Sequence, residues 1–153
     1  MRTVLVLQGV PGSGKSHFAN DYVSRAHARS VVVSADDFFY RLGGGTEYAF
    51  NPARLGEAHG DCFRRFIAAV QAGVEVVVVD NTNTTVPEMS PYVLGGEAFG
   101  YTVEILQVVC DPEVAAARNR HGVPAAAIHA MAARIASCQM PPWWRVTTHP
   151  AGV

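Results

Sequence analysis

The stretch GVPGSGKS, residues 9–16, decides the fold of this 153-residue chain. It fits the pattern G-x-x-x-x-G-K-[ST], in which glycines let backbone N–H groups turn inward around a phosphate. Residues 2–8 have the apolar, β-branched composition of a buried strand, and a helical pattern runs from Lys15 to about Ala28. A glycine loop between a strand and a helix N-terminus is the setting that phosphate binding needs. The predicted phosphate-binding residues are Gly9, Pro11, Gly12, Ser13, Gly14, Lys15 and Ser16.

Lys15 is the only lysine among the twelve basic residues of the chain. In this motif the lysine amine bridges the outer phosphates of a nucleoside triphosphate, and the hydroxyl of the following residue binds Mg²⁺. A turn that only joined a strand to a helix would explain the glycines, but neither the lone lysine nor Ser16. The sequence therefore predicts that ATP and Mg²⁺ bind here, with Lys15 as a catalytic residue and Ser16 as a metal ligand.

The remainder of the chain alternates between strand and helix patterns. Further strands are predicted at residues 30–34, 74–80, 101–110 and 145–148. Further helices are predicted from 51 to 72, from Pro87, from 111 to 120 and from 124 to about 138, and a loop at 41–51. This alternation predicts a three-layer α/β/α fold with a mainly parallel sheet of four to five strands. The length suits one domain spanning residues 1–153.

Composition narrows the classes of protein. Hydrophobic residues make up 49% of the chain, but no apolar run approaches the roughly 20 residues that span a bilayer. We therefore expect no membrane partner. The three cysteines are widely spaced and form no disulfide framework, which favours reduced thiols and a cytoplasmic location. The net charge of -1 lacks the basic bias of a protein that binds long stretches of duplex.

Carboxylates follow two of the predicted strands, at the sheet edge where ligands of parallel sheets bind. Asp80 ends the strand VVVVD and is predicted to bind Mg²⁺; the alternative is a turn-forming aspartate that leads into residues 81–83. Asp36 and Asp37 follow the second strand, where a carboxylate can take the proton of an acceptor hydroxyl. Neighbouring side chains point different ways, so one of the two is expected to face the phosphate and the other to cap the next segment.

Residues 118–124, RNRHGVP, predict a glycine hinge between two helices. Such an element suits a helical lid whose arginines, Arg118 and Arg120, reach the transferring phosphate. The alternative is a pair of solvated arginines that complement a helix C-terminus. His59 falls in register with Leu55 and Cys62 on the inner face of the third helix, where a hydrogen-bonded core histidine is expected. Trp143 and Trp144 are expected to seal an edge of the core.

With these residues in place, the chain resembles the P-loop kinases that include the phage-type 5′-hydroxyl polynucleotide kinases. It resembles more closely the small kinase domain of a family of eukaryotic ubiquitin-ligase-binding proteins and their bacterial relatives. The matching segments are GVPGSGKS at 9–16, SADDFF at 34–39, NPARLGEAH at 51–59, VVDNTNT at 78–84 and RNRHGVP at 118–124.

The resemblance implies an adenylate-kinase-like core with Lys15 and Ser16 on the triphosphate. It further implies Asp36 as the base toward the acceptor hydroxyl, and Arg118 and Arg120 as lid arginines. The candidate acceptor-binding residues are Asp37, Arg41, His59, Asp80, Asn81, Thr82 and Asn83. Polynucleotide kinases typically carry an arginine three residues after the base, whereas this chain has Phe39 there and its nearest arginine is Arg41.

These patterns lead to one favoured function and two alternatives. The favoured one is an ATP-dependent kinase that transfers the γ-phosphate to a hydroxyl, with the 5′-OH end of RNA or DNA as the leading acceptor. The first alternative keeps this chemistry and changes the acceptor to a small metabolite, nucleotide or sugar nucleotide. The second is a non-enzymatic ATP-binding switch that captures a partner through the loop at 43–50.

Overall fold

The computed structural model describes residues 1–26 and 28–150, which form a five-stranded sheet in the order β2-β3-β1-β4-β5. The strands are β1 (Thr3–Gln8), β2 (Ser30–Val33), β3 (Val76–Asp80), β4 (Thr102–Val109) and β5 (Val146–Pro150). Each neighbouring pair is parallel, so all carboxyl ends lie at one edge of the sheet. This confirms the predicted parallel sheet, including its fifth strand.

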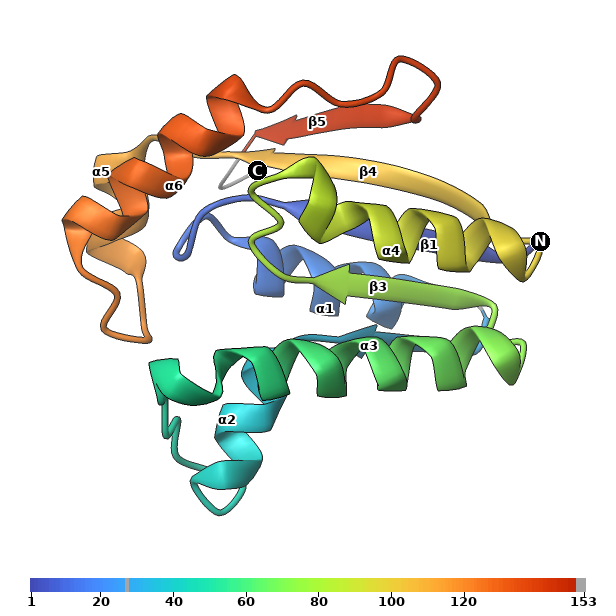
Figure 1. The fold of residues 1–153 in the computed structure, drawn as a ribbon, viewed down its shortest axis with the longest axis horizontal. Coiled ribbons are helices and arrows are strands. Elements are labelled where there is room, and N and C mark those ends of the chain that lie inside the picture. Colours follow the sequence, from blue (N-terminus) through green and yellow to red (C-terminus); the bar gives the residue numbers. More distant parts are fainter. Residues whose placement is uncertain (27, 151–153) are drawn as a thin grey trace.

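Three helices cover the two faces of the sheet: α1 (Lys15–Arg25), α3 (Leu55–Gln71) and α4 (Val86–Ala98). In Figure 1, α3 and α4 lie in front of the strands and α1 lies behind them. Alternate residues of β1 point to the two faces. Val4 and Val6 pack with Phe66 of α3, and Leu5 and Leu7 pack with Ala19 of α1. The two hydrophobic cores confirm the three-layer α/β/α arrangement.

The remaining helices lie near the carboxyl ends of the strands. They are α2 (Asp36–Leu42), the short 3-10 turn η1 (Pro52–Arg54), α5 (Pro112–Arg118) and α6 (Ala125–Ser137). Figure 1 shows α2 at the lower left and the α5–α6 pair at the upper left, on either side of the strand ends. The pair is anchored by a small apolar cluster in which Val10 packs with Ala115 and Ile128. The predicted helical lid is therefore attached to the glycine loop.

In η1 and α5, the side chain before the first proline accepts a hydrogen bond from a backbone N–H group that would otherwise be free. Asn51 accepts a hydrogen bond from the N–H of Ala53 at 3.0 Å, and Asp111 accepts one from the N–H of Glu113 at 2.8 Å. Two helix ends differ slightly from the prediction. Helix α1 ends at Arg25 rather than near Ala28, and α5 ends at Arg118 rather than at residue 120.

Two predictions about residues near α2 and α3 were wrong. Residues 36–42 form α2, so the segment from Arg41 to Asn51 is not entirely loop. His59 and Leu55 are exposed, and the buried side chains of α3 are Ala58, Cys62, Phe66, Ala69 and Val70. The predicted inner face of α3 is thus confirmed from Cys62 onward, but the first turns of the helix are uncovered, and His59 is not a core histidine.

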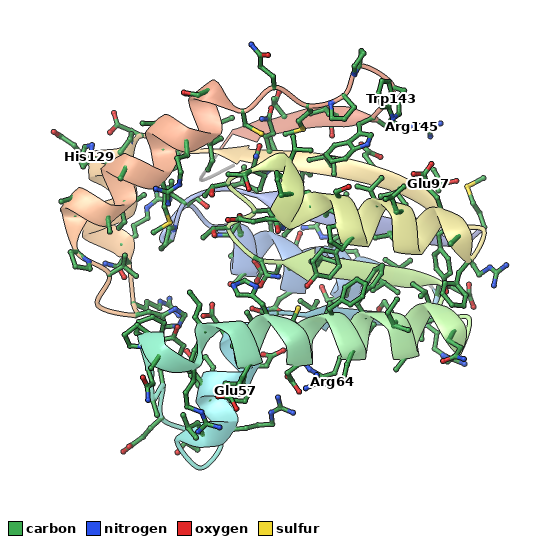
Figure 2. The ribbon with its side chains drawn as sticks, in the orientation of Figure 1. Glu57, Arg64, Glu97, His129, Trp143 and Arg145 are labelled. Atoms are coloured by element: carbon green, nitrogen blue, oxygen red, sulfur yellow. The ribbon has the colours of Figure 1, made fainter. Side chains whose placement is uncertain are left out.

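The two neighbouring tryptophans differ in burial. Trp144 packs against the larger core, as expected, but Trp143 is 81% exposed. Figure 2 labels Trp143 on the turn before β5, at the end of the sheet away from α5. Within residues 1–26 and 28–150, no helix is long and apolar enough to cross a membrane.

Candidate active site

The glycine loop, residues 9–14, leaves the central strand β1 and enters α1. Gly12 and Gly14 have φ angles of 81° and 98°, a backbone region that disfavours side chains. Gly9 lies close to Val108 of β4, where an added Cβ would stand 2.9 Å from the Val108 carbonyl oxygen. These turns give the loop its inward curve, which the sequence pattern predicts.

Lys15, Ser16 and Asp80 meet at the base of this loop. The register of β1 and β3 pairs Leu7 with Asp80, which places the carboxylate beside the start of the loop. The Ser16 hydroxyl donates a hydrogen bond to Asp80 Oδ2 at 2.8 Å, and Lys15 Nζ donates one to the Val10 carbonyl oxygen at 3.0 Å. Lys15 is 7% exposed and Asp80 is 8% exposed, so both charged groups are shielded from solvent.

Burial sets the electrostatics of this pair. Loss of solvent lowers the pKa of Lys15, and the nearby carboxylates of Asp80 and Asp36 oppose that change. Loss of solvent likewise raises the pKa of Asp80, against the opposing effects of Lys15 and the Ser16 hydrogen bond. A bound phosphate would pair with the Lys15 amine, and a bound metal ion would pair with the Asp80 carboxylate. Each buried charge would then have a partner of opposite sign.

The residues of this loop fit a nucleotide and Mg²⁺. A hydroxyl and a carboxylate at hydrogen-bond distance are oxygen ligands of the kind that Mg²⁺ prefers. Ser13 Oγ is buried and, within the described residues, has no hydrogen-bond partner, so it can donate to a phosphate oxygen. An added Cβ at Gly14 would meet nothing within 4 Å, which leaves space above the loop for the phosphates.

The side chains of Asp36 and Asp37 point in different directions, as the sequence predicts for neighbours. Asp37 forms an ion pair with Arg65, with 3.0 Å between its Oδ2 and the guanidinium Nη1. Asp36 accepts a hydrogen bond from the Tyr48 hydroxyl at 2.8 Å, and 43% of its side chain is exposed. Asp36 therefore faces Tyr48 and the connection after α5, whereas Asp37 is paired with α3.

Arg65 is a residue of this region that the sequence does not single out. Its guanidinium donates to Asp61 Oδ2 at 3.0 Å and to the Ser34 carbonyl oxygen at 2.7 Å, besides the pair with Asp37. Arg41 also forms an ion pair with Asp61 of α3, so α3 holds the Arg41 side chain in place. Arg65 therefore ties α3 to the turn between β2 and α2 that carries Asp36.

The asparagines after β3 bind neighbouring parts of the protein. Asn81 Oδ1 accepts from the N–H of Ala35 at 2.9 Å, which ties the end of β3 to the end of β2. Asn83 has a φ of 48° and donates from Nδ2 to the Leu7 carbonyl oxygen at 2.7 Å. Both side chains are buried, whereas Thr82 is half-buried and its carbonyl oxygen accepts from the N–H of Gly9 at 3.1 Å.

The two arginines predicted to lie on the lid are at the surface. Arg118 is the last residue of α5, Arg120 follows it in the connection to α6, and both are exposed. Asn119 between them caps this connection, because its Oδ1 accepts from the N–H groups of His121 and Val123, each at 3.1 Å. His121 lies 3.8 Å from Asp36, between its Nδ1 and the carboxylate Oδ2, so the lid reaches the candidate base.

A phosphate loop on the central strand of a parallel sheet, facing a carboxylate of the adjacent strand, defines the P-loop fold of kinase type. A sequence model of the family described as "AAA domain" matches residues 4–138. The chain therefore belongs to this family of P-loop domains, which confirms the resemblance seen in the sequence.

Two curated proteins are similar to parts of the chain. Human NEDD4-binding protein 2 is 35% identical over 124 residues, which are 78% of this chain and 7% of that protein. The rat 2′,3′-cyclic-nucleotide 3′-phosphodiesterase is 33% identical over 82 residues, which are 54% of this chain and 18% of that protein. The chain thus spans a small part of the length of these relatives.

Solved structures share the fold. The structure of the Pnkp1/Rnl/Hen1 RNA repair complex matches with a TM-score of 0.71 and 20% identity, over 89% of this chain and 44% of the matched one. A sugar kinase from Janibacter sp. HTCC2649 matches with a TM-score of 0.64 and 19% identity, over 98% of this chain and 85% of its own. A gluconokinase from Sinorhizobium meliloti 1021 matches with a TM-score of 0.63 and 15% identity, over 100% and 86%.

Proposed function

We propose that this domain is an ATP- and Mg²⁺-dependent kinase that transfers the γ-phosphoryl group to a hydroxyl. The observation that carries the proposal is the half-exposed carboxylate of Asp36 at the carboxyl edge of the sheet, the edge at which the phosphate loop also lies. Ser16 and Asp80 are hydrogen-bonded at the base of the loop, and Asp36 follows β2, which is the next strand but one from β1 in the sheet. A nucleotide-binding switch would need the loop but no half-exposed carboxylate at the same edge of the sheet.

The residues of the site have distinct tasks in this reaction. The loop N–H groups and Lys15 would bind and orient the phosphates, as they do in other P-loop proteins. Ser16 and Asp80 would hold Mg²⁺, which neutralises negative charge on phosphate oxygens when it is bound. Asp36 would accept the proton of the attacking hydroxyl. Arg118 and Arg120 would stabilise charge that develops on the transferring group and help to exclude water when the lid closes.

The leading acceptor is the 5′-OH end of RNA or DNA. The segments that resemble polynucleotide kinases extend over most of the chain, and the matched Pnkp1 structure belongs to an RNA repair complex. The net charge of -1 suits an acceptor held at its end rather than along its length.

The test is incubation with γ-labelled ATP, Mg²⁺ and a single-stranded oligonucleotide with a 5′-OH end. We expect label on the 5′ end, and none on an oligonucleotide that already carries a 5′-phosphate. Asp36→Asn is the matched control, because it keeps the size of the side chain and removes the base. This variant should bind ATP as the wild type does and lose about 10²- to 10⁴-fold in turnover. Unchanged turnover in Asp36→Asn would remove Asp36 from the mechanism.

A small metabolite is the second candidate acceptor. The sugar kinase and gluconokinase match nearly the whole chain and most of their own length, whereas the repair-complex chain is matched over 44%. The near-neutral net charge is consistent with a small acceptor. Label transfer to small molecules in a cell extract, with none to oligonucleotides, would favour this acceptor.

A further inference from the structure

Three ring side chains from separate segments meet above Asp36. Tyr40 lies on α2, Tyr48 lies in the loop that follows it, and His121 lies in the connection between α5 and α6. The ring of His121 stacks on that of Tyr48, with 3.9 Å between centroids and 15° between planes. His121 Nε2 lies 2.9 Å from the Tyr40 hydroxyl oxygen. We refer to Tyr40, Tyr48 and His121 as the ring clamp, because they join the lid to the loop at 43–50.

The ring clamp also contacts both oxygens of the Asp36 carboxylate. The Tyr48 hydroxyl donates to Oδ1 at 2.8 Å, and His121 Nδ1 lies 3.8 Å from Oδ2. With the ring proton on Nδ1, His121 accepts a hydrogen bond from the Tyr40 hydroxyl through Nε2, and its N–H nitrogen is the one that lies 3.8 Å from the carboxylate. Burial, followed by the bond to Asp36, raises the pKa of Tyr48, so its phenol remains a hydrogen-bond donor.

We propose that the ring clamp holds the connection between α5 and α6 against the loop at 43–50 and so orients the Asp36 carboxylate, with Tyr48 and His121 as positioning residues. This inference rests on the proposed function, in which Asp36 is the base. Asp36 is partly exposed and stands at the first residue of a short helix, so its own backbone does not fix its rotamer. A displacement of about 1 Å at a reacting group can cost about 10²-fold in rate, and a donor held by stacked rings limits that displacement.

Packing alone does not require the polar atoms of the clamp. Tyr48 lies against Phe39 and Phe50, and a phenylalanine at position 48 would make the same ring contacts. The hydroxyl of Tyr48 and the ring nitrogens of His121 are the atoms that face Asp36 and Tyr40. Substitution of the hydroxyl alone therefore separates positioning from packing.

The first test is the kinetics of Tyr48→Phe, with Tyr22→Phe as the control on the exposed side of α1. We expect kcat to fall about 10- to 100-fold in Tyr48→Phe. The KM for ATP and the thermal midpoint should stay at their wild-type values, and the control should leave all three unchanged. A wild-type kcat in Tyr48→Phe, or an equal loss in ATP affinity, overturns the positioning role.

The turnover of Asp36→Asn, measured in the same assay as that of Tyr48→Phe, separates this inference from the proposed function. If Asp36→Asn is inactive while Tyr48→Phe is fully active, the ring clamp is refuted and the base assignment stands. If Asp36→Asn itself keeps full turnover, the base assignment and the positioning role fall together. Loss of turnover in both variants, with ATP binding retained, supports both proposals.

The second test needs no activity. Hydrogen exchange should be measured in His121→Ala and in the control His129→Ala, which changes an exposed histidine of α6 (Figure 2). We expect His121→Ala to speed exchange in both the 43–50 and the 119–124 segments, while His129→Ala leaves both unchanged. Faster exchange at 119–124 alone would show that the clamp does not join the two segments.

Discussion

Gly12→Ala tests whether the phosphate loop and the lid helix share one close contact. Gly12 has a φ of 81°, and an added Cβ would overlap the carbonyl oxygen of Ala115 and stand 3.0 Å from the backbone nitrogen of Asn119. A residue with a Cβ costs about 1–2 kcal/mol in this backbone region. Forcing atoms into a packed contact adds about 1–3 kcal/mol. We therefore expect Gly12→Ala to lower the free energy of unfolding by about 2–5 kcal/mol.

Gly14→Ala is the matched control within the same loop. Gly14 has a φ of 98°, but its added Cβ would meet nothing within 4 Å, so only the backbone cost of about 1–2 kcal/mol remains. Urea unfolding followed by far-UV circular dichroism, without nucleotide, measures both variants. If Gly12→Ala is no less stable than Gly14→Ala, the close packing of the loop on α5 is wrong. Because α5 carries Arg118, Gly12→Ala should also lower kcat.

Three further predictions concern charged groups. Lys15→Ala should lower kcat by at least about 10²- to 10³-fold in the label-transfer assay, because a charge that stabilises the transferring phosphate is lost; retained activity would refute the assigned nucleotide site. Arg118→Ala and Arg120→Ala should lower kcat more than ATP affinity, measured by kinetics beside calorimetry, and equal losses would leave these arginines a binding role only. Burial raises the pKa of Asp61, but hydrogen bonds from Arg65 and Arg41 outweigh it and hold this pKa below its usual value. Asp61 therefore contributes stability above the unfolded-state pKa of about 3.9, and this contribution is lost as pH falls through the lower folded-state value. Asp61→Asn should lower the free energy of unfolding at neutral pH and weaken its dependence on pH in acid. Urea unfolding measures this free energy at each pH, and a difference from wild type that is the same at every pH would contradict the prediction.

The phosphate loop and the sheet could be predicted because their signals are local. A glycine motif between an apolar strand and a helix fixes the position of Lys15 and Ser16 along the chain. Runs of valine identify buried parallel strands, and the end of such a run places Asp80 at the sheet edge. The meeting of Ser16 and Asp80 then follows from the adjacent, parallel pairing of β1 and β3.

The elements beyond the sheet were harder to predict, because tertiary contacts decide them. No helix was predicted at residues 36–42, and the loop predicted from Arg41 overlaps their end, yet these residues form α2 around the fully buried Phe39. The first turns of α3 lie past the carboxyl ends of the strands (Figure 1), so Leu55 and His59 keep the periodicity of a buried face without a sheet to cover them.

The surroundings of Asp36 depend on contacts between distant segments. Nothing local to Tyr48 or His121 shows that their rings stack. Nothing in the sequence distinguishes Arg65 from an ordinary surface arginine, although its guanidinium donates hydrogen bonds to three groups near the turn that carries Asp36. The choice between Asp36 and Asp37 as the base came from family resemblance; the different partners of the two carboxylates support it. The assigned roles, like the single-domain boundary at 1–153, stay predictions.

The lone lysine gives this protein a convenient chemical property. Apart from the α-amino group, Lys15 carries the only primary amine of the chain, and burial lowers its pKa, so more of that amine is uncharged and nucleophilic at a given pH. An acylating reagent small enough to enter the loop would therefore modify one side chain. Protection of that amine from acylation would report nucleotide occupancy by mass spectrometry, on the unmodified wild-type sequence.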